Sequence, residues 1–261
     1  MTCYSFDFIG TEVNVDGRFD HAQLLFLERL LGKHMAGKTV LDIGANIGNH
    51  ARAFAASAGK VLSFEPHPRT FQLLRLNTMD TPNIEIFEIG ASDHVAALPA
   101  VSPKLNFGAS TITDQPAGEG EFGWTCNVAP LDDLAAPDWG EIAVMKIDVE
   151  GHEPQAIRGA SKLLAQHRPV ILFEQNHDAI ADDTSESLEL LRGLGYRHFW
   201  SLEIQSSWRT PQALPGALRK ALRIGEGALF GPPAEKAVLV PVDRLDPRSY
   251  AMLIASFDSF P

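Results

Sequence analysis

Short apolar segments alternate with amphipathic segments along most of this chain, and this alternation constrains the fold more than any other feature. The apolar runs are strand-length and continuous, as in a sheet that is buried on both faces; they read KTVLDIG, KVLSFEP, NIEIFEIG, IAVMKID and PVILFE. Between them, apolar residues recur at helical spacing, for example Ala51, Phe54, Ala55 and Ala58. The sequence therefore predicts the α/β class: a mainly parallel sheet with helices on both faces, in a single domain over residues 1–261.

The region before the first of these strands is predicted to be an N-terminal extension over residues 1–37. Residues 4–15 alternate around a glycine, which is typical of a small hairpin. Asp20 and Gln23 have the spacing of a helix cap, and leucines at helical spacing follow them as far as Gly32. We expect a small hairpin followed by a capped helix.

The rest of the chain divides into a core over residues 38–178 and a C-terminal part over residues 179–261. Within the core, residues 94–127 contain the run DQPAGEGEFG and are expected to form an elaborated loop. Two segments of the C-terminal part, YRHFWS and AVLVPV, are expected to close the sheet. Residues 204–225 include several basic residues and no acidic residue. This composition predicts a solvated surface or, alternatively, a flap over residues 204–235.

The charge of the chain limits its partners. The chain has 22 basic and 33 acidic residues and a formal net charge of −11, so its average surface repels nucleic acids and anionic membranes. No apolar run is long enough to cross a bilayer. Cys3 and Cys126 are too few for a disulfide framework, and Cys126 is expected to be a small buried side chain. We expect a cytoplasmic protein with a small-molecule partner, and the sequence leaves the oligomeric state open.

The run DIGANIGNH follows the first core strand, at the place where open parallel sheets bind ligands. Gly44 permits a sharp turn out of the strand, and Gly48 lets the next helix pack closely. Glu65 ends the second strand about 20 residues further on, the spacing at which an acidic side chain accepts hydrogen bonds from a ribose. The pattern predicts a nucleotide site.

Charge and a missing glycine indicate which nucleotide to expect. A dinucleotide site requires the pattern G-x-G-x-x-G beneath a pyrophosphate, but Asn46 occupies the middle position. Asp42 precedes the turn, where a carboxylate repels phosphate and attracts a sulfonium or an ammonium group. These residues favour S-adenosylmethionine over NAD. Alternatively, Asp42 only caps backbone N–H groups, and Asn46 and Asn49 are only turn residues.

Ionisable residues gather after the fourth core strand, in the run KIDVEGHEP. Such a gathering at the carboxyl end of a strand is typical of a functional site. An alcohol must lose its proton as it attacks a methyl group, and a carboxylate or imidazole within reach can accept that proton. Asp148 and then His152 are the candidate bases, and Glu150 is the third residue predicted to be catalytic.

Each residue of this run also has a structural interpretation. Glu150 and Glu153 complement the N-terminal dipole of a helix that begins near Pro154, and we favour this interpretation for Glu153. Lys146 pairs with a neighbouring carboxylate and so reduces the net charge of the cluster. His152 is equally suited to be a hydrogen-bond partner at the turn.

A metal site is an alternative use of the same sheet edge. Asp148, Glu174 and Asn176 offer three oxygen ligands of the kind that Mg²⁺ prefers. Because such residues also line cofactor sites that hold no metal, the sequence predicts a site without one.

Six motifs occur in the order and at the separations found in a known family. They read VLDIGANIGNH, SFEPHP, EIGASD, FGASTI, MKIDVEGHE and VILFE. Over roughly residues 38–175 the chain resembles the FkbM family of S-adenosylmethionine-dependent methyltransferases. The resemblance implies a class I methyltransferase (Rossmann-like) fold and methyl transfer to a hydroxyl oxygen of a sugar or secondary metabolite.

The resemblance also implies roles for individual residues. It assigns the ribose to Glu65 and the adenine to the neighbourhood of Ser92 and Asp93, and it assigns the cofactor loop to Asp42, Gly44, Asn46 and Gly48, with Asn49 beside them. No motif matches beyond residue 178, where we expect acceptor specificity. An NAD-dependent oxidoreductase and a non-catalytic nucleotide-binding module remain the alternatives.

Overall fold

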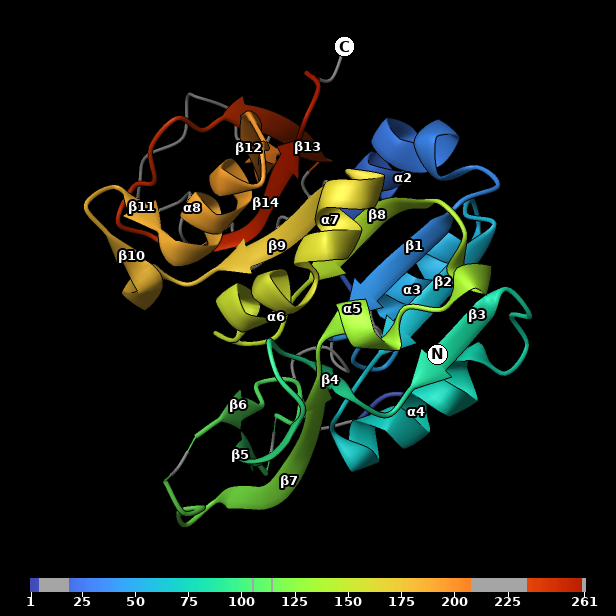
Figure 1. The fold of residues 1–261 in the computed structure, drawn as a ribbon, viewed down its shortest axis with the longest axis vertical. Coiled ribbons are helices and arrows are strands. Elements are labelled where there is room, and N and C mark those ends of the chain that lie inside the picture. The colour runs from blue at the N-terminus through green and yellow to red at the C-terminus, as the bar shows by residue number, and fades with distance from the viewer. Residues whose placement is uncertain (5–18, 105, 114, 208–233, 260–261) are drawn as a thin grey trace, which may run out of the picture.

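An eight-stranded sheet with helices on both faces makes up most of the structure (Figure 1). The computed structural model describes residues 1–4, 19–104, 106–113, 115–207 and 234–259. The strand order is β13-β12-β14-β9-β8-β1-β2-β3. The bounds of these strands are Thr39–Ile43 (β1), Lys60–Phe64 (β2), Ile84–Phe87 (β3), Ile142–Ile147 (β8), Val170–Gln175 (β9), His198–Ser207 (β12), Ala234–Pro241 (β13) and Tyr250–Ser256 (β14).

Neighbouring strands from β9 to β3 are all parallel. β14 is antiparallel to both β9 and β12, and β13 is antiparallel to β12. Every residue of β1 and β8 is buried, because helices cover both faces of the parallel part. The predicted α/β class with a mainly parallel sheet is confirmed.

Helices on the two faces bury separate apolar clusters against the sheet. The helices are α2 (His21–Met35), α3 (Asn49–Ala55), α4 (Pro68–Thr78), α5 (Leu131–Leu134), α6 (Glu153–Gly159), α7 (Ser161–His167) and α8 (Glu186–Gly193), with short 3-10 turns at Pro137–Trp139 and His177–Ala179. On one face, Leu31 of α2 belongs to the same cluster as Val40 of β1. On the other face, Ile157 of α6 and Leu191 of α8 share a cluster with Ile43 of β1.

The start of α2 differs from the prediction. Asp20 has a left-handed backbone, with φ of 52°, and its side chain makes no cap hydrogen bond. Gln23 instead donates from Nε2 to the sulfur of Met252 at 3.4 Å, and the helix continues past Gly32 to Met35. The predicted capping pair is wrong because a contact with β14 uses the side chain of Gln23. Of the hairpin predicted over residues 4–15, all but Tyr4 lies outside the described residues.

The segment predicted to be an elaborated loop is instead part of a second sheet. This sheet has the order β4-β7-β5-β6 and consists of Gly90–Ala91 (β4), Ala96–Pro103 (β5), Thr111–Ile112 (β6) and Glu121–Ala129 (β7). β5 and β7 pair antiparallel over eight positions, from Ala96 opposite Val128 to Pro103 opposite Glu121. Cys126 is buried on β7, as expected. The second sheet lies beside the carboxyl ends of the parallel strands in Figure 1.

The C-terminal part completes the large sheet. The two predicted closing strands are present as β12 and β13. The sequence analysis missed β14, which inserts between β9 and β12, and the small hairpin of Ile180–Ala181 (β10) and Thr184–Ser185 (β11). Most of the predicted flap over residues 204–235 lies outside the described residues.

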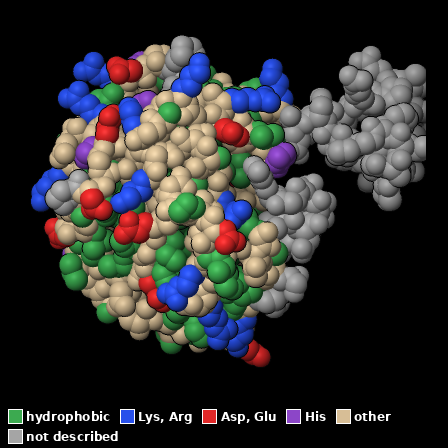
Figure 2. All heavy atoms as spheres, turned by 90° about the vertical axis from the view of Figure 1, so that its right-hand side faces the viewer, with side chains coloured by type: hydrophobic (Ala, Val, Ile, Leu, Met, Phe, Trp, Pro, Cys, Tyr) green, Lys and Arg blue, Asp and Glu red, His purple; other side chains and the backbone are tan. Residues whose placement is uncertain are grey.

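Two further observations concern the surface. On the face shown in Figure 2, acidic and basic side chains are interspersed over the part of the chain that is described. Among the described residues, every helix is too short or too polar to span a membrane.

Candidate functional site

The turn after β1 is pressed against the end of β8. Gly44 has φ of +77°, and a Cβ atom at this position would lie 1.8 Å from the backbone oxygen of Asp148. Only glycine fits there, because both the backbone conformation and the contact exclude a side chain. Asn46 follows with φ of 49°, and its N–H points toward β2. The turn thereby joins the ends of three neighbouring strands.

Glu65, directly after β2, is held by this turn. Its Oε2 accepts a hydrogen bond from the backbone N–H of Asn46 at 2.9 Å, and its Oε1 accepts one from the backbone N–H of His67 at 2.8 Å. Burial raises the pKa of Glu65 to about 7. Each carboxylate oxygen has a second lone pair, so the carboxylate is oriented by the backbone and can still accept hydrogen bonds from a ligand.

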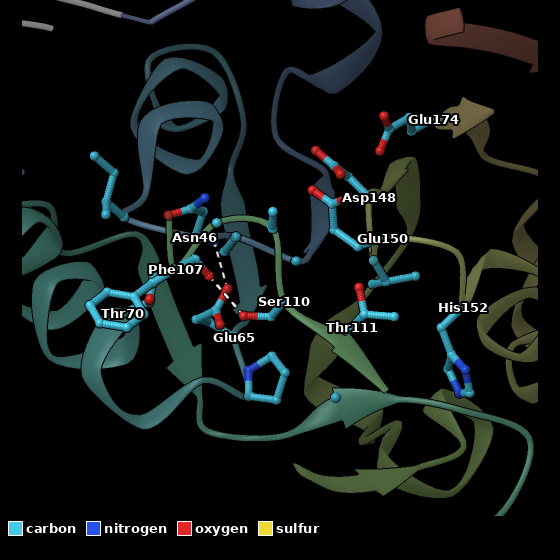
Figure 3. A pocket seen from close by; sticks show the side chains of 18 of the residues that line it. Asn46, Glu65, Thr70, Phe107, Ser110, Thr111, Asp148, Glu150, His152 and Glu174 are labelled. Atoms are coloured by element: carbon cyan, nitrogen blue, oxygen red, sulfur yellow. Dashed lines mark hydrogen bonds between the residues drawn. The ribbon is translucent and has the colours of Figure 1, made fainter. Parts of the chain in front are cut away.

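A cavity of about 310 Å³ opens between the turn, the carboxyl ends of β8 and β9, and the second sheet (Figure 3). Glu65 lies at one end, and Asp148, Glu150 and Glu174 lie at the other. Apolar side chains of the second sheet form one wall, which consists of Ala91, Ala100, Trp124, Cys126 and Val128. The cavity thus combines an apolar wall with polar groups at its ends, which is the usual composition of a small-molecule site.

Lys146, which lines the cavity, forms a charge cluster with one buried and one partly exposed carboxylate. Its Nζ lies 2.9 Å from Oδ2 of Asp148 and 3.7 Å from Oδ1 of Asp42. Burial raises the pKa of Asp42, which has no exposed surface, although Lys146 acts against this shift. Asp42 does not line the cavity, so it can act on a bound ligand only through Lys146 and the local field.

Three carboxyl groups converge at the far end of the cavity. Asp148, Glu150 and Glu174 each offer an oxygen atom, and these atoms lie within 4.8 Å of one another. Burial and the charge of Asp148 raise the pKa of Glu150 to about 7 and that of Glu174 to about 8. Burial alone would also raise the pKa of Asp148, but Lys146 outweighs it and lowers this pKa below its usual value. Near pH 7, Asp148 is therefore ionised, and Glu174 keeps its proton in a hydrogen bond with Asp148.

The same three carboxyl groups are close enough to share a divalent cation. Glu150 takes the place that the sequence alternative gave to Asn176. The Glu150 side chain reaches the cavity because Glu150 and Gly151 form a turn with positive φ, 51° and 95°.

His152 lines the cavity but faces away from the three carboxyl groups (Figure 3). Its Nε2 lies 2.9 Å from the hydroxyl of Ser92, and burial lowers its pKa. Ser92 is fully buried, and Asp93 lies outside the cavity beside His94 and Arg158. Neither Ser92 nor Asp93 lines the cavity, so their assignment to the adenine stays a prediction.

Asn49 and Glu153 have local structural partners. Asn49 donates to the backbone oxygen of Phe19 at 2.9 Å and accepts from its N–H at 3.3 Å, so that Phe19 and Asp20 form part of the cavity lining. Glu153 accepts hydrogen bonds from the N–H groups of Val149 and Gly151, which agrees with the structural interpretation that we favoured for it.

Sequence reasoning missed the contribution of the second sheet to this site. Residues 106–112 and the β7 residues Trp124 and Cys126 lie in the segment that the sequence analysis expects to be an elaborated loop. The motif FGASTI, one of the six family motifs, is the sequence signal for this segment.

The comparison with known families agrees with this geometry. The family model described as "Methyltransferase FkbM domain" matches residues 42–198, which is more than half of the chain and includes Asp42, Glu65 and the three carboxyl groups. The chain belongs to the FkbM methyltransferase family.

Individual relatives of this FkbM family member are distant. It is 32% identical over 139 residues to "Hexuronic acid methyltransferase AglP" from Haloferax volcanii, an alignment that covers 50% of this chain and 53% of that protein. This chain therefore matches only about half the length of that relative.

Two solved methyltransferase structures are also similar. Methyltransferase FkbM from Methylobacillus flagellatus KT has a TM-score of 0.41 at 18% identity, covering 67% of this chain and 41% of its own. Precorrin-6y C5,15-methyltransferase from Geobacter metallireducens GS-15 has a TM-score of 0.45 at 14% identity, covering 92% of this chain and 93% of its own.

Proposed function

We propose that this protein is an S-adenosylmethionine-dependent O-methyltransferase that acts on a hydroxyl group of a small sugar or secondary metabolite. One observation carries the proposal: a single cavity joins an oriented carboxylate at the end of β2 to three carboxyl groups at the ends of β8 and β9. The first can bind a ribose, and the others can bind and deprotonate an alcohol. Membership of the FkbM methyltransferase family supports the same assignment.

The residues around Glu65 fit this cofactor. Glu65 offers free lone pairs to two ribose hydroxyls, and the wall that contains Trp124 and Val128 offers an apolar surface to an adenine. The net excess of carboxylates suits a ligand with a sulfonium and an ammonium group, and it disfavours a pyrophosphate. When bound, S-adenosylmethionine supplies a methyl group activated by the positive sulfur. We propose that the turn from Gly44 to Asn49 holds its methionine end.

In this proposal, Asp148 and Glu150 have different roles toward the acceptor. Asp148 is ionised and fixed by Lys146 at 2.9 Å, so it can accept a hydrogen bond from an acceptor hydroxyl next to the reacting one and orient the acceptor. Glu150, with a pKa of about 7, is better matched to take the proton as the new C–O bond forms. His152 is the weaker candidate, because its Nε2 is already paired with Ser92.

Transfer of a labelled methyl group tests this function. The purified protein is incubated with S-adenosylmethionine labelled in its methyl group and with polar metabolite extracts, with and without a chelator. We expect label in a small hydroxylated product, a loss of about 10²- to 10⁴-fold in turnover for Glu150→Gln, and full turnover for the exposed control Glu189→Gln. If no extract accepts label, the proposed activity is wrong.

The charge of the cavity favours an acceptor without a carboxylate. AglP is described as a hexuronic acid methyltransferase, whose acceptor is an acid. In the described lining of this cavity, Lys146 is the one lysine or arginine, and it already pairs with Asp148 and Asp42. A sugar carboxylate beside Asp148 and Glu150 would add a negative charge with no partner. We therefore propose a neutral sugar or polyol, and expect methyl glucoside to be preferred over methyl glucuronide in the same assay.

A further inference from the structure

One wall of the cavity is a short segment to which the mechanism gives no role. Each residue from Asn106 to Ile112 lines the cavity. In Figure 3, Ser110 and Thr111 face the space between Glu65 and Glu150. The segment therefore borders both the end assigned to the cofactor and the end assigned to the acceptor.

The segment is fixed at its C-terminal end by the second sheet. Thr111 pairs with Val101, and Ile112 pairs with Ala100, in the antiparallel ladder of β6 and β5. The N–H of Thr113 donates to the backbone oxygen of Pro99 at 3.0 Å. The backbone at Thr111 is thus held in place before any ligand binds.

An aromatic anchor fixes the other end. Phe107 is 5% exposed, and its ring centroid lies 5.1 Å from those of Tyr4 and His67. The guanidinium of Arg69 lies 5.4 Å from the same ring. Ser110 donates its hydroxyl proton to the backbone oxygen of Phe107 at 2.7 Å, so this hydroxyl group holds the segment together.

Thr111 is the residue that this scaffold presents to a ligand. Its side chain is exposed to the cavity, and its hydroxyl makes no hydrogen bond within the part of the chain that is described. In Figure 3 the hydroxyl points toward Glu150, on the acceptor side. A threonine hydroxyl can donate one hydrogen bond and accept others, as a sugar hydroxyl can.

We propose that Thr111 positions the acceptor, by a hydrogen bond between its hydroxyl and a second hydroxyl group of a polyol whose neighbouring hydroxyl is methylated at Asp148 and Glu150. The inference rests on the proposed function, since it requires that the acceptor occupies this end of the cavity. Thr111 takes part in no proton transfer and is a positioning residue. A fixed hydroxyl on a preorganised strand holds the acceptor at little cost in conformational freedom.

Two substitutions at Thr111 and one control test this inference. Thr111→Val has nearly the same shape but no hydroxyl, whereas Thr111→Ser keeps the hydroxyl. Thr113→Val is the matched control, because the hydroxyl of Thr113 accepts the N–H of Gln115 and lies outside the cavity lining. For Thr111→Val we expect an acceptor KM about tenfold higher, with the KM for S-adenosylmethionine and the melting temperature unchanged. Thr111→Ser and Thr113→Val should remain near wild type.

Binding without turnover separates this inference from the proposed function. Saturation-transfer NMR with methyl glucoside, in the presence of S-adenosylhomocysteine, should detect the glycoside on wild-type protein and a much weaker signal on Thr111→Val. Equal signals or equal acceptor KM values for wild type and Thr111→Val would overturn the role of Thr111. So would a rise in acceptor KM for Thr113→Val as large as the rise for Thr111→Val. Wild-type protein that binds the glycoside through Thr111 but transfers no methyl group would contradict the proposed function alone.

Discussion

Replacement of Glu174 by glutamine should make the cofactor-free protein more stable at high pH. Burial and the charge of Asp148 raise the pKa of Glu174 from 4.5 to about 8. The unfolded chain releases this proton near pH 4.5, but the folded chain releases it only near pH 8. Between these values the folded state binds more protons than the unfolded state, so the free energy of unfolding falls as the pH rises.

The size of the effect follows from this shift in pKa. At about 1.36 kcal/mol per pKa unit, the shift sets an upper limit of about 5 kcal/mol on the penalty at pH 8 and above. Glu174 lines the open cavity and is only partly buried, so solvent screening reduces this to about 2 kcal/mol. A glutamine amide can donate to Asp148 as the protonated carboxyl group does, and it never ionises.

Urea denaturation at pH 5 and pH 8.5 measures the effect. Glu174→Gln should match wild type at pH 5 and exceed it by about 2 kcal/mol at pH 8.5. Glu189→Gln is the control, because hydrogen bonds from Thr184 and Arg192 lower the pKa of this exposed residue. Its replacement by glutamine should therefore not raise the free energy of unfolding at high pH. A difference between Glu174→Gln and wild type that is the same at both pH values would refute the reasoning.

Three other perturbations test the site. Gly44→Ala should lower the free energy of unfolding by about 3 kcal/mol or more, because its Cβ would lie 1.8 Å from the Asp148 backbone oxygen, and unchanged urea denaturation would contradict the tight turn. Lys146→Met should lower the free energy of unfolding by about 3–5 kcal/mol, because Asp42 is then buried without its cation. The double variant with Asp42→Asn should regain part of this loss. An unchanged free energy of unfolding in the single variant would refute the pairing. S-adenosylhomocysteine should bind about tenfold more weakly at pH 6 than at pH 8, since protonation of Glu65 near pH 7 removes acceptors for the ribose, and a calorimetric affinity independent of pH would count against that contact.

The parallel core and the turn after β1 could be predicted because their signals are local. Each strand of the core is a continuous apolar run, and the helices between them keep a helical period. Gly44 and Glu65 are placed by the same local pattern, since the ends of neighbouring parallel strands meet at one edge. For this reason the sequence analysis placed Asp148 and Glu150 at the edge where the structure brings them together.

The second sheet depends on pairings that the local pattern does not display. β5 and β7 are joined by a long connection over residues 104–120, and their pairing brings Leu98 opposite Cys126. The pairing of β6 with β5 then holds Thr111 in the cavity wall. A strand pairing between distant segments is set by tertiary packing, so the run was expected to be a loop.

Ser92 illustrates a second limit of local reasoning. The resemblance assigns the adenine to the neighbourhood of Ser92, which stays a prediction, and no local pattern indicates that the Ser92 side chain faces His152 across the start of α6. This contact requires α6 to approach β4 closely, which Gly159 permits, since a Cβ there would lie 1.8 Å from the Ser92 backbone oxygen. Which way a side chain points at such a junction depends on packing between elements far apart in the chain.

We propose that the turn after β1, together with Glu65, holds a sulfonium nucleoside and not a dinucleotide. Calorimetric titration of the purified protein at pH 8 with S-adenosylhomocysteine and, separately, with NAD tests it most directly. We expect saturable one-to-one binding of S-adenosylhomocysteine and no heat of binding for NAD. Saturable binding of NAD at this site, or the absence of binding by S-adenosylhomocysteine, would contradict the account.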